Sequence, residues 1–145
     1  MWVPNCGDYT LSRVDLKTGV VTATIQVAIG DSEGRLAVGA GAVWLCTDPK
    51  GVLARIDPSS NKVVAEIKVQ PRSFAVACDE SAVWATSTEK SVLMCIDPRL
   101  NQVVQQFAGA GGDEIQIGKG SVWLSNLRAG NVWRLDPNKI EATRP

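Results

Sequence analysis

The sequence contains no histidine at any of its 145 positions. Imidazole is the most frequent general base of enzymes, the base of Ser-His-Asp triads and the commonest metal ligand. Its absence excludes histidine-based triads, histidine general bases and zinc sites of the Cys/His type. The four cysteines include no CxxC pair, so the usual spacing of a cysteine-based metal site is missing too. The sequence therefore predicts no metal site and no cofactor.

An excess of charge and long apolar runs are also missing. Fifteen Lys and Arg residues balance fifteen Asp and Glu residues, so the formal net charge is zero. Nucleic acids and anionic membranes are bound mainly through clustered positive charge, and neither is an expected partner. No apolar run approaches the roughly 20 residues that span a bilayer. The first residues lack the basic and apolar regions of a secretory signal peptide, so none is expected in this sequence.

Tryptophan marks an internal repeat. Four Trp residues are separated by 42, 40 and 39 positions, and an aspartate follows each of them thirteen positions later. Three of these aspartates precede a proline, and a Val-Val pair follows the turn in three copies. The repeated residues are Trp2, Trp44, Trp84 and Trp123 with Asp15, Asp57, Asp97 and Asp136. The repeat predicts four units, at approximately residues 1–30, 31–70, 71–109 and 110–145.

Each unit is predicted to form four short strands. In the second unit they are residues 35–38, 42–46, 52–57 and 62–69, separated by segments rich in Gly, Pro and Asn. No segment keeps a helical period for three turns. Four antiparallel strands in about 40 residues are typical of a β-propeller blade, whose apolar faces are covered by neighbouring blades. A stacked solenoid has the same period, but its units are usually helical. We therefore predict an all-β fold, a single β-propeller domain of about 3.5 to 4 four-stranded antiparallel blades.

The unit Ala-Val-Trp, Ile-Asp-Pro, Asn-Lys-Val-Val resembles the YVTN-type repeat of seven-bladed propellers. It is also similar to the virginiamycin-B-lyase-like propellers, whose blades carry Gly-x-Val-Trp and then Asp-Pro. The resemblance covers nearly the whole chain and implies a propeller that is often periplasmic or extracellular. The lyase uses a catalytic histidine, which this sequence lacks, so the resemblance does not extend to lyase chemistry.

The aligned units predict an incomplete ring. The first unit begins within its second strand, and the last unit holds a weak fourth strand at best. An open inner edge is a liability that proteins usually cover. We expect that the remainder of a larger propeller, or a homo-oligomer of this chain, completes the ring.

Candidate binding residues lie on the loops of one channel rim. With the strands of a blade lettered A to D from the axis outward, ligands of propellers generally meet the B–C and D–A loops. Three cations at nearly the same repeat position, Lys50, Lys90 and Arg128, would suit an anionic ligand, although solvent-exposed loops are polar in any case. The predicted ligand-binding residues are Asp48, Lys50, Arg72, Glu89, Lys90, Asp113, Asn126 and Arg128.

Three functions remain open. The leading interpretation is a binding or interaction module that presents this rim to a protein, a peptide or a small ligand, without catalysis. A histidine-free lyase or hydrolase would instead need two converging carboxylates, and its candidates are Asp31, Glu33, Asp113 and Glu114. A purely structural role would use the open edges for assembly.

Other recurrent residues are expected to be structural. The Arg that stands two positions before the Asp, as in Arg55, is predicted to pair with that Asp, which also caps its turn. The repeated Trp is predicted to fill the space between blades, whereas Trp133 stands outside the pattern and is the candidate for an exposed aromatic side chain. The cysteines occupy four different repeat positions, which predicts free thiols, with Cys78 in a buried apolar position.

Overall fold

The computed structural model describes residues 1–29, 35–109, 112–127 and 129–139. The regular secondary structure of these residues consists of β-strands alone, which confirms the predicted all-β class. The strands are β1 (Trp2–Asn5), β2 (Thr10–Val14), β3 (Val21–Gln26), β4 (Leu36–Gly39), β5 (Ala42–Asp48), β6 (Val52–Asp57), β7 (Lys62–Lys68), β8 (Ser73–Cys78), β9 (Val83–Ser87), β10 (Val92–Asp97), β11 (Gln102–Ala108), β12 (Glu114–Gly118), β13 (Ser121–Asn126) and β14 (Asn131–Leu135).

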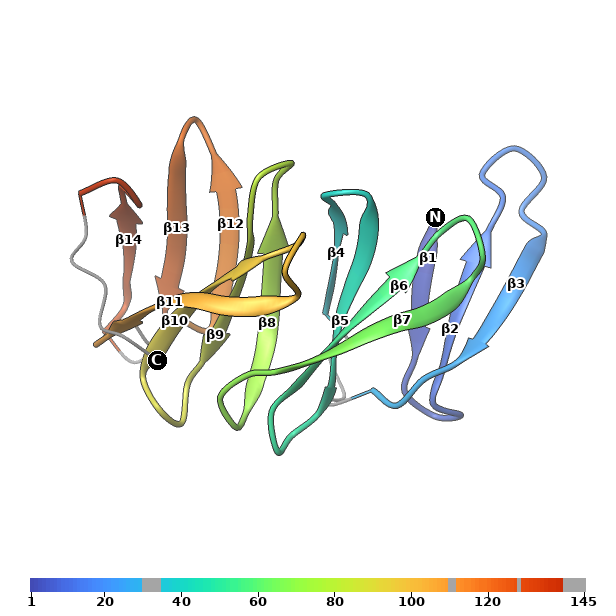
Figure 1. The fold of residues 1–145 in the computed structure, drawn as a ribbon, viewed down its shortest axis with the longest axis horizontal. Coiled ribbons are helices and arrows are strands. Elements are labelled where there is room, and N and C mark those ends of the chain that lie inside the picture. The colour runs from blue at the N-terminus through green and yellow to red at the C-terminus, as the bar shows by residue number, and fades with distance from the viewer. Residues whose placement is uncertain (30–34, 110–111, 128, 140–145) are drawn as a thin grey trace.

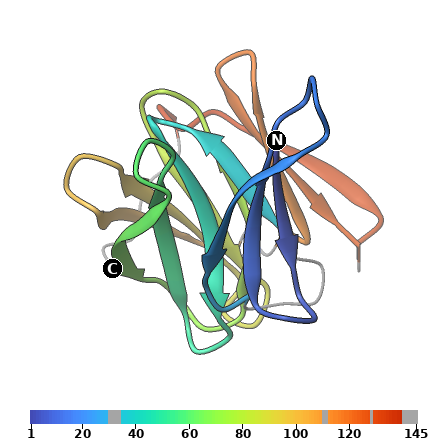
Figure 2. The ribbon, with the colours of Figure 1, turned by 90° about the vertical axis from the view of Figure 1, so that its right-hand side faces the viewer.

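The strands form four antiparallel sheets, each built from consecutive strands. We call them the first blade (β1–β3), the second blade (β4–β7), the third blade (β8–β11) and the fourth blade (β12–β14). Figure 1 shows the blades side by side in chain order, with the first and the fourth at opposite ends. Figure 2, seen from the end of the first blade, shows the sheets one behind another.

The hydrophobic core lies between the blades rather than within one of them. Neighbouring residues of a strand face opposite sides of a sheet, so Val43 packs against the first blade while Trp44 packs against the third. Trp44 and Trp84 are 0% and 4% exposed, which confirms that the repeated Trp fills the space between blades. Three clusters join consecutive blades, and they centre on Leu11 with Ile56, on Trp44 with Met94, and on Trp84 with Ile115.

A β-bulge recurs where β2, β6 and β10 pair with the outer strand of the blade. Ile56 pairs with Val63 while Arg55 pairs with Ala65, so Val64 is an extra residue that the ladder skips. The equivalent extra residues are Thr22 and Val104. A bulge of this kind bends the strand and increases its twist. It also explains the Val-Val pairs of the second and third units, because one valine packs inward while the other, Val64 or Val104, is exposed.

The recurrent aspartates cap the turns of the outer hairpins, as predicted. Asp57 Oδ1 accepts the backbone N–H of Ser59 over 2.8 Å, and the turn ends at Asn61, which has a φ of 55°. Asn tolerates this left-handed conformation better than most residues. Equivalent bonds are made by Asp15, Asp97 and Asp136.

The recurrent arginines do not pair with these aspartates, and that prediction is wrong. Arg55 lies over the Trp44 ring, 5.5 Å from its centroid, and its Nη1 donates across to the third blade. The acceptors are Pro98 O at 2.8 Å and Asn101 Oδ1 at 3.0 Å. Because each Asp carboxylate already accepts the N–H groups of its own turn, the arginine is left to bond the turn of the next blade. We call this contact the Arg–turn link.

The first blade makes the same link to the second. Arg13 lies 5.5 Å from the Trp2 ring centroid, and its Nη1 donates to Pro58 O and Asn61 Oδ1, over 2.6 and 3.1 Å. The third unit has Cys95 at the arginine position, and Ile140 stands at the asparagine position of the fourth unit. Donor and side-chain acceptor are therefore both replaced at the third junction.

Two predictions about single side chains are corrected. Trp133 is partly buried against the third blade, whereas Trp123 is 37% exposed. Trp133 lies on the inward-facing side of its strand, and Trp123 on the outer face of the fourth blade. Cys78 is only half-buried, although its sulfur packs so closely against Gly39 across the blade junction that a Cβ added there would lie 2.7 Å from it.

Candidate functional site at the loop rim

The two kinds of rim loop are tied to each other by backbone hydrogen bonds. Val69 N–H donates to Gly51 O over 3.0 Å, and Gly109 N–H donates to Ser91 O over 2.8 Å. The chain that leaves an outer strand therefore begins its D–A loop beside the B–C loop of the same blade. Gly51 and Ser91 both have positive φ, 105° and 52°. The backbone turns sharply at these two positions, and the B–C loop and the D–A loop of each blade therefore lie at the same rim.

A cavity of about 630 Å³ opens at this rim, between loops of the third and fourth blades. Of the predicted binding residues that the structure describes, it contains four. They come from loops that are far apart in the sequence, which the blade packing brings together. The lining residues are Arg72, Thr88, Glu89, Ser91, Gly109, Asp113, Asn126 and Ala129.

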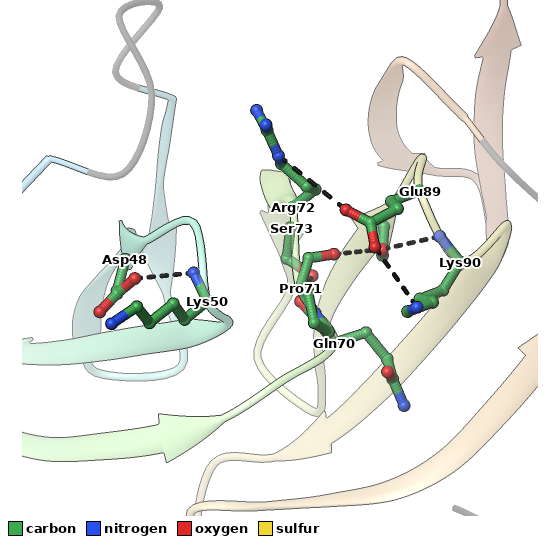
Figure 3. Close-up of polar contacts among 9 residues, drawn as sticks. Asp48, Lys50, Gln70, Pro71, Arg72, Ser73, Glu89 and Lys90 are labelled. Carbon is green, nitrogen blue, oxygen red and sulfur yellow. Dashed lines mark hydrogen bonds and ion pairs between the residues drawn. The ribbon is translucent and has the colours of Figure 1, made fainter.

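Arg72 and Glu89 form one side of the cavity. Arg72 has a φ of 56°, and its N–H donates to Pro49 O over 2.8 Å, which fixes the end of its loop against the second blade. Its Nε lies 3.9 Å from Glu89 Oε2, and Lys90 Nζ lies 3.3 Å from Glu89 Oε1 (Figure 3). The Arg72 and Glu89 side chains are 68% and 49% exposed. Exposed ion pairs of this kind contribute little energy, so both side chains can exchange partners for a ligand.

Asp113 and Asn126 form the other side and are held more firmly. Asp113 Oδ2 accepts the N–H of Leu127 over 2.6 Å, and its own N–H donates to Ser125 O. Asn126 Oδ1 accepts the N–H of Ala129 over 3.2 Å. Within the described part of the chain, Asp113 Oδ1 and the Asn126 amide nitrogen have no hydrogen-bond partner. These two groups are available to a ligand.

The remaining predicted binding residues are not gathered at this cavity. Asp48 Oδ1 accepts the N–H of Lys50 over 2.7 Å within the B–C loop of the second blade. Figure 3 shows these two residues apart from Arg72, Glu89 and Lys90. Lys90 is paired with Glu89, and Arg128 lies outside the described residues. Lys50 and Lys90 are therefore not gathered at this cavity, and the basic ring that includes Arg128 stays a prediction.

Thr88, Ser91, Gly109 and Ala129 also line the cavity and were not predicted. Thr88 and Ser91 flank the predicted Glu89 and Lys90, so the loop was recognised but not these small polar residues. Gly109 opens a glycine-rich segment of the sequence. These small residues carry no charge that would single them out in the sequence, so only their charged or polar neighbours were predicted.

The carboxylates of the enzyme interpretation are only partly described. Asp31 and Glu33 lie outside the described residues. Glu114 forms an ion pair with Arg35, which connects the fourth blade to the residue preceding β4 of the second. Asp113 and Glu114 both line an adjoining cavity of about 420 Å³. Among the described residues no cluster of three or more metal-ligating side chains is present.

The cysteines are free thiols, as predicted. Burial raises the pKa of Cys46 to about 12, and burial followed by nearby carboxylates raises the pKa of Cys78 and Cys95 to about 11. A thiol that stays protonated at neutral pH is a poor nucleophile. These three cysteines are therefore poor candidates for a catalytic nucleophile. No helix in the described ranges is long and apolar enough to cross a membrane.

The repeated sheets, their face-to-face cores and their shared loop rim define a β-propeller. No family model and no curated protein matches the sequence. Solved structures with similar folds include dihydro-heme d1 dehydrogenase NirN in complex with DHE, with a TM-score of 0.71 and 16% identity over 99% of this chain. BamB from Moraxella catarrhalis has a TM-score of 0.68 and 13% identity over 87% of this chain. The WD40 repeats of RRP9 have a TM-score of 0.65 and 9% identity over 92% of this chain.

These similarities support the propeller fold, since WD40 repeats are propeller blades. At such low identity they show the fold alone. The chain spans 34%, 38% and 46% of the three matched chains, in the order given above.

Proposed function

We propose that this chain is a β-propeller binding module that holds a short peptide segment in the cavity between the third and fourth blades. The observation that carries the proposal is the convergence of Arg72, Glu89, Asp113 and Asn126 on one cavity of about 630 Å³. This volume falls in the range of ligand pockets. The four side chains come from three loops and from the end of β13, so the propeller scaffold positions them.

The lining favours a ligand with a positive group and several amides. Among the described lining residues, one arginine stands against two carboxylates, and Asn126, Thr88 and Ser91 supply uncharged hydrogen-bonding groups. Asp113, fixed by the Leu127 N–H, is suited to accept a hydrogen bond from an amine or guanidinium. Arg72, weakly paired with Glu89, can bond a carbonyl or a carboxylate.

We further propose that the chain belongs to the YVTN-type and virginiamycin-B-lyase-like group of propellers. The support is positional: the Trp of the Val-Trp motif fills the blade junction, and the Asp of the Asp-Pro motif caps the outer turn. A location outside the cytoplasm belongs to the same proposal, as does a ring completed by further blades, either of a larger propeller or of a second copy of this chain.

A titration of the isotope-labelled protein with tripeptides of the form Gly-x-Gly tests the binding function. The central residue would be Lys, Ala or Glu, and the readout is the amide chemical shift of Ser91, Gly109 and Ala129. We expect the Lys peptide to shift these three amides at the lowest concentration. If no peptide shifts them at millimolar concentration, the proposal fails.

Matched variants sharpen the test. Asp113→Asn keeps an oxygen for the Leu127 N–H but removes the charge, and we expect it to weaken binding of the Lys peptide about tenfold or more. Lys50→Ala changes the equivalent B–C loop on another blade and should leave binding unchanged. Cleavage of a peptide during the titration would instead favour the carboxylate enzyme, for which Glu89 and Asp113 share the cavity.

A further inference from the structure

The outer face of the fourth blade has the construction of a blade junction, but no described residue covers it. Trp123 Nε1 donates to Gly118 O over 3.2 Å, as Trp44 Nε1 donates to Gly39 O over 3.0 Å. Arg134 lies 5.5 Å from the Trp123 ring centroid, the same separation as Arg55 from Trp44. Trp123 is nevertheless 37% exposed, while Trp44 is 0% exposed.

A second residue of this face is also uncovered. Val132 is 65% exposed, although Leu53 and Leu93, at the same repeat position, are both 0% exposed. Exposed apolar side chains that adjoin one another mark an interaction site. We call Trp123, Val132 and Arg134 the donor face.

The internal junctions show what covers a donor face. In both of the Arg–turn links, arginine Nη1 donates to the turn of the next blade. The hydrogen bond of Arg134 within the described chain uses Nε, which donates to Ser121 Oγ over 3.0 Å. The donor face therefore fits a propeller blade that presents a turn carbonyl beside apolar side chains.

The first blade presents such a surface at the opposite end of the molecule. Met1 is 57% exposed, but Val43, at its repeat position, is 0% exposed; Val21, at the position of Val63, is 53% exposed. Leu16 stands where Pro58 and Pro98 stand, and it is 77% exposed. We call Met1, Leu16 and Val21 the acceptor face.

We propose that the donor face binds the acceptor face of a second copy of this chain, with Arg134 donating to the Leu16 carbonyl of that copy. The two faces differ, so the contact is heterologous, and two such contacts close a cyclic dimer. Each copy has four sheets, so the dimer has eight, within the range that propellers use.

The proposed link lacks one acceptor. Gly19 stands where Asn61 and Asn101 stand, so the turn of the first blade offers Arg134 a carbonyl but no side-chain amide. Gly19 has a φ of 71°, close to the 55° of Asn61, and a Cβ added there would meet no atom within 4 Å. Gly19→Asn should therefore supply the missing acceptor without disturbing the turn.

Light scattering and sedimentation equilibrium of the 145-residue chain test the proposal. We expect the wild type to form dimers at a concentration on the order of 10–100 μM. Arg134→Ala and Val132→Glu should each raise the dimer dissociation constant about tenfold or more, while Gly19→Asn should lower it several-fold. Val64→Glu is the matched control, because it adds the same charge at a position that is 52% exposed but lies on neither face.

Circular dichroism would verify that each variant keeps its β content. A wild type that stays monomeric at several hundred micromolar overturns the proposal. A dimer that is insensitive to Val132→Glu and Gly19→Asn overturns it as well, and open polymers would contradict closure. None of the substituted residues lines the peptide cavity, so this result and that of the peptide titration are independent.

Discussion

Arg55 in the second blade reaches Asn101 in the third, and its Nη1 donates to Asn101 Oδ1 over 3.0 Å. The bond joins residues that lie 46 positions apart in the sequence. The same guanidinium lies over Trp44, so the side chain that packs in the junction also orients the donor that crosses it. Cation–π contacts of this kind are worth about 0.5–1 kcal/mol at exposed sites and more when desolvated.

Removing this donor should destabilise the protein. We expect Arg55→Ala to lower the free energy of unfolding by about 1.5–3 kcal/mol, because Pro98 O and Asn101 Oδ1 lose a charged partner. Urea unfolding followed by tryptophan fluorescence measures the effect. Arg99→Ala is the control, because this side chain is 87% exposed in its pair with Asp97, and it should cost about 0–1 kcal/mol. Equal losses in the two variants would contradict the importance of the link.

The junction between the third and fourth blades lacks the Arg–turn link, so the link can be tested there by introducing it. Cys95 replaces the donor there, and Ile140, at the repeat position of the acceptor, lies outside the described residues. Cys95 is 7% exposed, so Cys95→Arg alone should destabilise by about 1–3 kcal/mol through a poorly paired buried charge. Adding Ile140→Asn should recover about 1 kcal/mol, measured as the coupling energy of a double-mutant cycle. Strict additivity of the two changes would show that no link had formed.

Gly51 is constrained by its backbone conformation and by its neighbours. It has a φ of 105°, and a Cβ at this position would lie 2.2 Å from Val69 O. Gly51→Ala should therefore lower the free energy of unfolding by about 1–3 kcal/mol or more. Gly7→Ala is the matched control, since Gly7 lacks a positive φ and has no atom within 4 Å of an added Cβ. A thermal melt of both variants checks this, and a loss confined to Gly7→Ala would refute it.

The capped aspartates predict a loss of stability in acid. Hydrogen bonds from the Ser59 N–H, and then from the Ser60 and Ser59 hydroxyls, lower the pKa of Asp57 from 3.8 to about 2. The Arg99 side chain, followed by the Arg99 N–H, lowers the pKa of Asp97 to about 2 as well. A carboxyl whose pKa is lower in the folded state stabilises the protein fully above its unfolded pKa. That contribution disappears as the pH falls from about 4 through 2.

Melting temperatures between pH 7 and pH 2 test this sign. We expect little change down to about pH 4.5 and a decline below it. The double variant Asp57→Asn and Asp97→Asn keeps oxygens that can cap the turns, so its decline should be shallower. If wild type and variant declined in parallel, these two carboxyls would not be responsible.

The fold was predictable because its determinants are local and repeated. The spacing of Trp44 and Trp84 set the size of a blade, and Asp57 with Pro58 marked the outer turn. The partner of Arg55 was not predictable in the same way. An Arg and an Asp two positions apart on one strand suggest a local pair, and only the packed blades show that the Asp is occupied by its own turn. The exposure of Trp133 and Trp123 was predicted the wrong way round for a similar reason, because the sequence does not show which face of the fourth blade is covered.

The candidate site was predictable at the level of loops but not of geometry. Arg72, Glu89, Asp113 and Asn126 were identified as polar residues of rim loops, and they share a cavity. Lys50 and Lys90 have the same repeat position, yet Lys90 is paired with Glu89 while Lys50 belongs to another loop. Residues at equivalent repeat positions lie on different blades, so a shared repeat position does not bring two side chains together. Cavities form where non-equivalent loops of adjacent blades meet.

The Arg–turn link also bears on how such a gene can grow. The second unit carries one donor, Arg55, and one acceptor turn, Pro58 to Asn61. A tandem duplication of this unit would therefore insert a matched donor and acceptor and leave both flanking junctions satisfied.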